Sequence, residues 1–296
     1  MLKKLILILA LCLLLSGCRA KTPVTTTQPP QTTAPEATQP PTPKPAGYQF
    51  PETVLVNDEN CTFTIRGVEP EGTFGYTLEV FLENKTDITL MFSLREVSVN
   101  GFMCEPYFAA TVSPGMKANE EVSFLQDDRA ANGITEVTDI EFVLAVYDST
   151  DILAEYLVEE DFVIYPKGEA AYQVYNREPQ PGDVVLFNNA GCAMTVTGFE
   201  PENIWGYAVN VYLENRTDDT LMFSASNVSV NGFMCDPYWA VEVAPGKKCN
   251  TQISWLESEL TENGITKVET ISLPLRVYES DDWNDALLRE TFTVTP

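Results

Sequence analysis

Residues 97–104 read VSVNGFMC, and the same eight letters recur 131 positions later. Within each copy, apolar residues alternate on both sides of an Asn-Gly pair. This pair is the preferred two-residue turn of a type I′ β-hairpin, because both of its positions need a positive φ. In that register Val99 faces Phe102 and Val97 faces Cys104. The octapeptide is therefore predicted to be a β-hairpin that directs these four side chains inward; a direct binding role is the alternative.

The repetition extends beyond the octapeptide, so the chain is a tandem duplication. At the same offset FGYTLEVFLENKTD from Phe74 matches WGYAVNVYLENRTD from Trp205, and TLMFS, PG-x-K and NGIT recur as well. We place repeat 1 at 48–166, an interdomain linker at 167–180 and repeat 2 at 181–296. Each repeat has the common size of an independent domain.

Apolar and polar residues alternate along much of each repeat. From Phe74 to Leu82 the apolar phase holds over nine residues, and a second such run begins at Ile140. A period of two indicates a strand with one buried face. Pro274 falls within the corresponding run of repeat 2, which predicts an edge strand or a bulge because proline cannot donate to the ladder.

One short helix is predicted in each repeat. Residues 123–126 (SFLQ) and 254–257 (SWLE) have the spacing of a capping box, and Gly133 and Gly264 stand where such a helix would end. Several short strands with almost no helix indicate an all-β fold. We therefore expect two tandem β-sandwich domains, each with one short helix.

The amino terminus combines a short basic run, an apolar stretch and a cysteine. Lys3 and Lys4 precede an apolar stretch too short to span a bilayer, and this stretch ends in Leu-Ser-Gly-Cys18. The run resembles the lipobox of bacterial lipoproteins, in which the chain is cleaved before the Cys and the Cys receives a lipid. The resemblance implies a signal peptide at 1–17 and a protein held by lipidated Cys18 on the extracellular face of the cytoplasmic membrane. An ordinary secretory signal is the alternative.

Residues 18–47 are predicted to be a disordered stalk. Between Lys21 and Ala46 the chain has eight prolines and eight threonines, a composition that cannot form a core and that favours extended polyproline II. At about 3.1 Å per residue this segment would reach roughly 80 Å. It would hold the repeats away from the membrane.

Charge and composition exclude several functions. The chain has 18 Lys and Arg against 43 Asp and Glu, a net charge of −25, which becomes −27 once the leader with its two lysines is removed. This acidity argues against nucleic acid, whose phosphates need basic side chains. The absence of His removes His-based zinc sites and the commonest general base. No nucleophile–base pair, phosphate loop or metal-ligand spacing is present, so we predict no enzymatic activity, no cofactor and no metal site.

Two acidic clusters carry oxygen ligands of the kind that Ca²⁺ prefers. They lie at 126–128 and 279–282. Neither has the ligand spacing of an EF-hand loop. We interpret both clusters as solvated turns.

Two cysteines recur at the same spacing in each repeat. Cys61 and Cys104 are 43 residues apart, as are Cys192 and Cys235. A disulfide across each repeat would explain this pairing, and two buried thiols that act as small apolar residues are the alternative. Cys249 has no counterpart in repeat 1 and is interpreted as a spare thiol.

Aromatic residues directly after each hairpin are the candidate ligand-binding residues. Tyr107 and Phe108 follow the first octapeptide, and Tyr238 and Trp239 follow the second. Exposed Tyr and Trp suit stacking on sugars or anchoring a protein partner. Core packing and cross-strand pairing are the alternatives. Repeat 2 is the favoured binding copy.

The order of motifs resembles a known family. Both repeats run through a strand, the LEN-K/R-TD turn, the VNGFMC hairpin, the PG-x-K turn, a short helix, NGIT and a strand ending in VYD or VYE. This order is similar to the immunoglobulin-like domains of uncharacterised Gram-positive surface lipoproteins. The resemblance covers both repeats and implies a surface-exposed, non-enzymatic module. We expect it to bind an extracellular protein or a cell-wall polysaccharide. A passive spacer or coat lipoprotein is the alternative, and a Ca²⁺-dependent or enzymatic role is the third.

Overall fold

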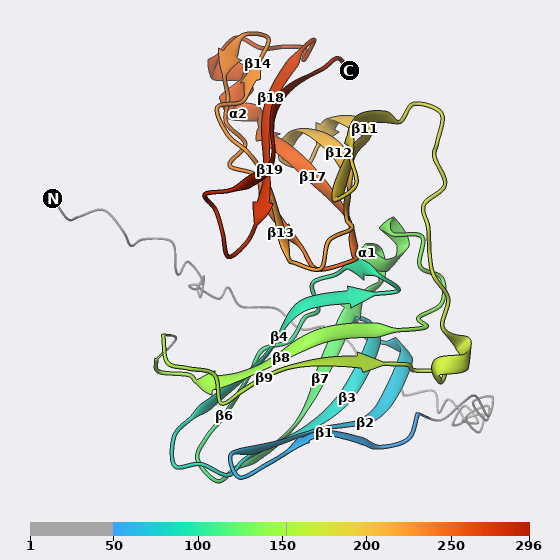
Figure 1. Ribbon diagram of the computed structural model, residues 1–296, viewed down its shortest axis with the longest axis vertical. Coiled ribbons are helices and arrows are strands. Elements are labelled where there is room, and N and C mark those ends of the chain that lie inside the picture. Colours follow the sequence, from blue (N-terminus) through green and yellow to red (C-terminus); the bar gives the residue numbers. More distant parts are fainter. Residues whose placement is uncertain (1–49, 152) are drawn as a thin grey trace, which may run out of the picture. The chain divides into compact units, whose positions relative to one another are not determined.

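The computed structural model describes residues 50–151 and 153–296. The predicted signal peptide, Cys18 and the stalk lie outside these residues. The described residues belong to one compact unit, and most of its regular structure is β-strand, as predicted (Figure 1). Within the described part of the chain, no helix is long and apolar enough to cross a membrane.

Repeat 1 contains nine strands and one helix among its described residues. They are β1 (Thr53–Asn57), β2 (Cys61–Gly72), β3 (Gly75–Asn84), β4 (Leu90–Val99), β5 (Phe102–Met103), β6 (Ala110–Val112), β7 (Lys117–Leu125), α1 (Gln126–Ala131), β8 (Ile140–Asp148) and β9 (Val158–Ile164). A short 3-10 helix, η1 (Glu169–Ala171), lies in the linker.

Repeat 2 follows the same order with ten strands and one helix. They are β10 (Val184–Asn188), β11 (Cys192–Asn203), β12 (Gly206–Asn215), β13 (Leu221–Ala225), β14 (Ser229–Val230), β15 (Phe233–Met234), β16 (Ala240–Val243), β17 (Lys248–Leu256), α2 (Glu257–Glu262), β18 (Ile271–Glu279) and β19 (Ala286–Val294).

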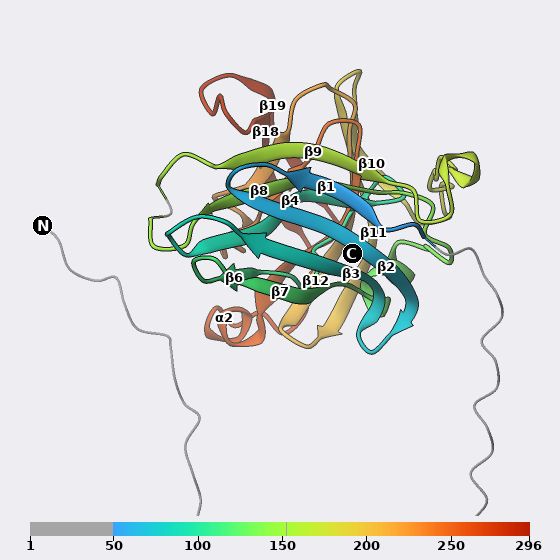
Figure 2. The same ribbon diagram turned by 90° about the horizontal axis from the view of Figure 1, so that it is seen from below.

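Repeat 1 has two layers of antiparallel strands with its core between them. One layer has the order β1-β2-β3-β7, and in the other β4 pairs with β8 and β8 with β9. Figures 1 and 2 show the two layers from different sides. The core takes Phe63 and Leu78 from the first layer and Phe92 and Leu144 from the second. Every second residue of a strand faces the same side, so the alternation seen in the sequence supplies both inner faces.

Repeat 2 repeats this arrangement around a core of its own. β10-β11-β12-β17 correspond to β1-β2-β3-β7, and β18 pairs with β13, β14 and β19 in the other layer. The second core includes Met194 and Val209 from the first layer and Phe223 and Leu273 from the second.

Pro274 marks the main difference between the two copies. β4 is one continuous strand, whereas the matching run of repeat 2 is divided into β13 and β14. Ser226 at this gap donates its N–H to the Pro274 carbonyl at 3.4 Å, so the missing N–H of the proline faces the gap. β18 has partners on both sides. The edge-strand alternative is therefore wrong. The bulge alternative is correct, because the four steps from Ala225 to Ser229 face three steps from Leu275 to Ser272, and repeat 1 has the same irregularity between Arg95 and Ser98.

The short helices begin later than the capping-box pattern predicts. α1 starts at Gln126, and neither helix has a side-chain cap bond. Ser123 belongs to β7, where its buried hydroxyl lies 3.3 Å from that of Thr77. The carboxyl ends agree with the prediction, since Gly133 and Gly264 follow the helices with φ of 68° and 71°.

The octapeptide forms the predicted hairpin in both repeats. Asn100 and Gly101 have φ of 51° and 76°, and the matching pair in repeat 2 has 51° and 85°, as a type I′ turn requires. Val99 pairs with Phe102. The Asn100 side chain also donates to the Glu136 carbonyl at 2.7 Å, which ties the turn to the segment before β8.

Candidate functional site: the hairpin end of repeat 2

The two identical hairpins have different surroundings. Phe102 is 3% exposed, whereas Phe233 at the matching position is 49% exposed. Met103 packs against the core of repeat 2, whereas Met234 is 63% exposed. The prediction of an inward-facing Phe is therefore correct in repeat 1 and wrong in repeat 2, and the cause lies outside the hairpin itself.

Repeat 2 covers the first hairpin. β5 pairs in parallel with β17, and the Lys248 N–H donates to the Gly101 carbonyl at 3.0 Å. The rings of Phe102 and Tyr212 lie 6.5 Å apart between centroids, and Lys248 Nζ lies 5.7 Å from the centre of the Phe102 ring. We call the contact made by Gly101, Phe102, Tyr212 and Lys248 the inter-repeat joint.

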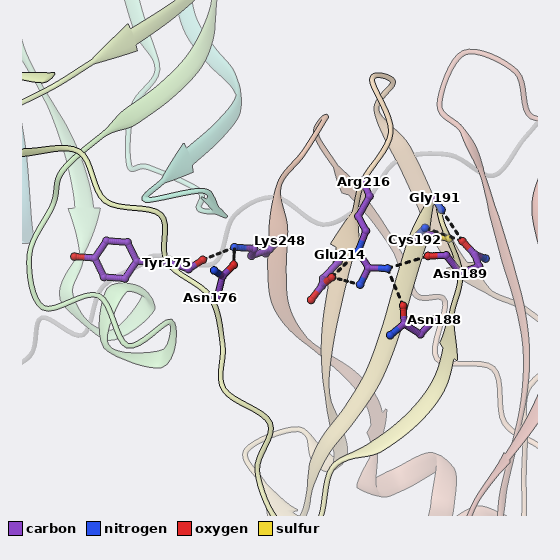
Figure 3. A network of polar contacts seen from close by, with 9 residues as sticks. All are labelled: Tyr175, Asn176, Asn188, Asn189, Gly191, Cys192, Glu214, Arg216 and Lys248. Carbon is purple, nitrogen blue, oxygen red and sulfur yellow. Dashed lines mark hydrogen bonds and ion pairs between the residues drawn. The ribbon is translucent and has the colours of Figure 1, made fainter. Parts of the chain in front are cut away.

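The linker holds Lys248 in place at this joint. Lys248 Nζ donates to the Tyr175 carbonyl and, at 3.0 Å, to Asn176 Oδ1 (Figure 3). Burial lowers the pKa of the Lys248 ammonium, because a charge in a poorly solvated place is disfavoured. Its carbonyl and amide partners and the face of the Phe102 ring replace part of the lost water.

A second linker residue stabilises Tyr212 from outside. The Arg177 guanidinium lies 5.6 Å from the centre of the Tyr212 ring. Arg177 also donates to both carboxylate oxygens of Asp183, at 2.6 and 2.7 Å. These hydrogen bonds lower the pKa of Asp183. The planar guanidinium therefore both stacks and pairs, which a lysine could not do in the same way.

Polar pairs and a cavity border the joint. The pairs are Lys247–Glu141 at 2.6 Å, Asn250–Asn132 at 2.8 Å and Thr220–Glu96 at 3.2 Å. Beside them lies a cavity of about 850 Å³, lined in part by Cys104 and Cys249.

The corresponding end of repeat 2 is open. Tyr238 is 92% exposed and has φ of 50°, a left-handed conformation that is rare for a bulky residue. Trp205 is exposed as well, and its carbonyl accepts a bond from the N–H of Glu257 at the start of α2. We call Trp205, Phe233, Met234 and Tyr238 the hairpin end of repeat 2.

The predicted aromatic pairs each divide into one outward and one inward residue. Tyr107 and Tyr238 are exposed. Phe108 instead packs edge-to-face on Phe63 at 6.3 Å, and Trp239 is only 7% exposed within the core of repeat 2. Consecutive residues of an extended segment point to opposite sides. Phe108 and Trp239 therefore serve the cores, and only the two tyrosines can meet a ligand at the surface.

The predicted disulfides do not form, and the five described cysteines are buried free thiols. Cys192 pairs with Asn215 at one end of β12. The Cys235 carbonyl accepts a bond from the Trp255 indole, and Trp255 pairs with Tyr207 near the other end of β12. The length of β12 between these ends is about 26 Å, whereas a disulfide needs Cα atoms within about 7 Å. The alternative of buried thiols as small apolar residues is correct.

Burial also makes these thiols unreactive. It raises the pKa of Cys61, Cys104 and Cys249 to about 12 and raises those of Cys192 and Cys235 as well. The nucleophilic and metal-binding form of cysteine is the thiolate, which is scarce at neutral pH under these conditions.

The LEN-K/R-TD motif is structural. Asn215 Nδ2 donates to the carbonyls of Asp219 and Val243, at 2.7 and 2.8 Å, and so closes a buried turn. Arg216 donates to Asn188 Oδ1 at 2.7 Å and clamps the preceding hairpin (Figure 3). The recurrence of this motif is thus explained by turn geometry.

A second cavity, of about 760 Å³, lies beside α2 in repeat 2. The Tyr207 hydroxyl in its lining is buried and has no hydrogen-bond partner within the described residues. Burial raises the pKa of Tyr207 to about 12, so this group stays neutral. Glu257 and Lys267 also line the cavity.

The acidic clusters do not gather around one point. Asp127 and Asp128 occupy the first turn of α1, where they complement the helix dipole. Across residues 50–151 and 153–296 no three Cys, Asp or Glu side chains are placed to hold a metal ion.

Comparison with known proteins gives no family. No family model and no curated protein matches the chain. Among solved structures, the YadV chaperone aligns at 11% identity and a TM-score of 0.22, over 74% of this chain and 92% of that chain. The CsuC–CsuE chaperone–tip adhesion subunit complex of Acinetobacter baumannii aligns at 13% identity and a TM-score of 0.20, over 73% of this chain and 90% of that chain. Red sea bream transglutaminase aligns at 11% identity and a TM-score of 0.21, over 81% of this chain and 31% of that chain. TM-scores this low carry no argument about fold or function.

Proposed function

We propose that the protein is a lipid-anchored surface protein that presents two immunoglobulin-like β-sandwich domains for non-catalytic binding. Its ligand is an extracellular protein or a cell-wall polysaccharide. The lipobox-like run before Cys18 and the Pro- and Thr-rich stretch support the tethered location. Two core clusters, each drawn mainly from one repeat, support the division into two domains; Tyr212 belongs to the first cluster and Met103 packs against the second.

One observation carries the binding role: the tip of the hairpin is covered in repeat 1, whereas in repeat 2 Phe233 and Met234 at the tip are exposed and Val228, Val230 and Cys235 stay buried. Burial of Phe102 against Tyr212 illustrates what the hairpin can do as a contact surface. At the second hairpin the apolar residues Phe233 and Met234 are left open to solvent, and the strongly exposed Tyr238 follows four positions after Met234. Aromatic and Met side chains grouped at an open surface are typical of binding sites.

Electrostatics also restrict the ligand. With 43 acidic against 18 basic side chains, the surface would repel anionic polymers over distances of about a Debye length, roughly 8 Å at physiological salt. A neutral glycan, or a protein with a neutral or basic contact face, fits better than an anionic one.

The test is capture from native surface and wall extracts with the soluble compact unit, residues 46–296. The unchanged protein is compared with Tyr238→Ala and with the matched control Tyr107→Ala, which removes the exposed tyrosine of the other repeat. We expect a specific protein or glycan to be retained by the unchanged protein and the control, and to be lost with Tyr238→Ala.

Two other outcomes are informative. Equal capture by all three proteins would move the site away from the hairpin end of repeat 2. If a folded sample captures nothing at any concentration, the passive spacer becomes the better proposal.

A further inference from the structure

We infer that the hairpin end of repeat 2 binds a second copy of this chain, at β7 of the second copy's repeat 1. This inference rests on the proposed binding role of that end and names its partner. The inter-repeat joint inside the chain is the template for this contact. There the hairpin at 97–104 docks on β17. The hairpin at 228–235 has the same eight residues, and β7 is the counterpart of β17.

The receiving strand has the properties that docking requires. β7 is the last strand of its sheet, and the backbone bridge between Tyr107 and Ser123 occupies only its far end. Lys117 at its start is the counterpart of Lys248, and its side chain is 61% exposed although it pairs with Glu83 at 3.2 Å. An edge strand with open N–H and C=O groups is a ready surface for another chain.

The aromatic part of the joint can be reproduced between copies. Phe81 stands where Tyr212 stands in repeat 2, and Lys117 Nζ lies 6.0 Å from the centre of the Phe81 ring. The Arg66 guanidinium lies 4.2 Å from the same ring centre, as Arg177 lies 5.6 Å from that of Tyr212. Phe233 would therefore meet an aromatic ring and an ammonium group, as Phe102 does. The Lys117 N–H would donate to the Gly232 carbonyl, as Lys248 does to Gly101.

Two of the three bordering polar pairs are also retained. At the offset of 131, the counterparts of Asn250 and Asn132 are Asn119 and Asn263, so the same amide–amide hydrogen bond is possible between copies. The counterparts of Thr220 and Glu96 are Thr89 and Asn227, which can also form a hydrogen bond. Asn263 uses its Nδ2 for the Glu259 carbonyl, as Asn132 uses its own for Asp128. Its Oδ1 is thus left as the acceptor, which is the role of Asn132 Oδ1 in the joint.

The remaining contacts are lost, so the contact between copies is weaker than the joint. The Lys247–Glu141 ion pair is replaced by Met116 and Ser272. Lys248 is also held by the linker groups of Tyr175 and Asn176, and the segment that precedes repeat 1 lies outside the described residues. A weak contact suits chains that are concentrated by a common membrane, because tethering raises the effective concentration.

This contact is head to tail, because it joins two different surfaces. Each chain has one open hairpin end and one open β7, so a single contact leaves one of each surface free, and further copies add there to give rings or filaments. A symmetric contact between two hairpin ends would stop at a dimer.

Sedimentation velocity of residues 46–296 over the micromolar range tests the inference. We expect the unchanged protein to grow from monomer into a ladder of species. We call the hairpin end of repeat 2 the head and β7 the tail. Phe233→Ala disables the head and Lys117→Glu disables the tail, and each should weaken association at least about tenfold, the effect of a hot-spot residue. Leu153→Ala, which truncates a more exposed apolar side chain elsewhere, is the control and should behave as the unchanged protein.

Mixing the two variants is the decisive step. Lys117→Glu keeps its head and Phe233→Ala keeps its tail, so the mixture should form dimers that cannot grow. If Phe233→Ala alone abolishes association and mixing restores nothing, the contact is symmetric and the inference is wrong.

A failure of this inference can be told apart from a failure of the proposed function. An unchanged protein that stays monomeric at every concentration overturns self-association. If the same sample still captures a foreign ligand through Tyr238, the binding role stands. If it captures nothing, both fail.

Discussion

Phe102 and Tyr212 lie with their ring centroids 6.5 Å apart, although they belong to different repeats and are 110 positions apart in the chain. Through this contact the hairpin at 97–104 of repeat 1 packs against repeat 2. It also gives the molecule an internal comparison, because the same eight residues occur once with a partner and once without.

Replacing the two matching phenylalanines should have unequal effects. Phe102→Ala removes a buried ring and leaves a cavity against Tyr212, so the free energy of unfolding should fall by about 3 kcal/mol. Phe233→Ala truncates a half-exposed ring and should cost less than about 1 kcal/mol. Urea unfolding of residues 46–296 in dilute solution measures both values. Equal losses would show that the hairpin of repeat 1 is not covered by repeat 2.

Asn215 should be one of the most sensitive polar positions. Asn215→Ala removes the donor to the buried carbonyls of Val243 and Ala244 and to the carbonyl of Asp219, and should lower the free energy of unfolding by about 2 to 4 kcal/mol. Asn84→Ala, its counterpart, which donates to Ile88 and Val112, should cost a similar amount. Arg216→Ala removes a partly exposed clamp and should cost about 1 kcal/mol or less. If Arg216→Ala were the more harmful change, the buried Asn would not be the centre of this turn.

The thiols of the repeats should be unreactive in the folded protein. Residues 46–296 contain Cys61, Cys104, Cys192, Cys235 and Cys249, all buried and free. We expect no reaction with a thiol reagent at neutral pH in native buffer and five equivalents in urea, without a reductant. Fewer than five equivalents in urea, restored to five by a reductant, would show that disulfides are present after all.

Acid should weaken the contact between linker and joint. Hydrogen bonds from Arg177 lower the pKa of Asp183 in the folded protein, whereas it is about 3.9 in the unfolded chain. The pair therefore stabilises the fold fully above about pH 4, and this contribution is lost as the pH falls through the lower folded value. Asp183→Asn should cost about 1 to 3 kcal/mol near neutral pH.

The pH series provides the control for that variant. The difference in unfolding free energy between the unchanged protein and Asp183→Asn should shrink as the pH is lowered below about 4. A difference that stays constant across this range would mean that the carboxylate charge is not what stabilises the linker.

Local patterns predicted the strands and the turns well. The alternation from Phe74 to Leu82, the Asn100-Gly101 turn and the glycines after both helices are set by backbone geometry within a few residues. Such features depend little on the rest of the chain. The all-β character could therefore be predicted from the amino-acid sequence alone.

Features that depend on distant partners were not predictable in the same way. Ser123 has capping-box spacing but finds Thr77 across the sheet. Cys192 and Cys235 are evenly spaced in the sequence yet lie at opposite ends of β12. Phe233 is exposed because no other part of the described chain covers it as repeat 2 covers Phe102. No pattern of eight residues could carry that information.

Amide hydrogen exchange at Lys248 and Lys117, measured as a function of protein concentration, tests the central claim most directly. Lys248 starts β17 and Lys117 starts the matching strand β7, and only Lys248 donates to a hairpin within the described part of the chain. We predict that the Lys248 amide is protected at every concentration. The Lys117 amide should exchange rapidly in dilute solution and slowly at high concentration, but not in Phe233→Ala. A Lys248 amide that exchanges as fast as that of Lys117 in dilute solution would contradict the joint, and a Lys117 amide that ignores concentration would contradict its repetition between copies.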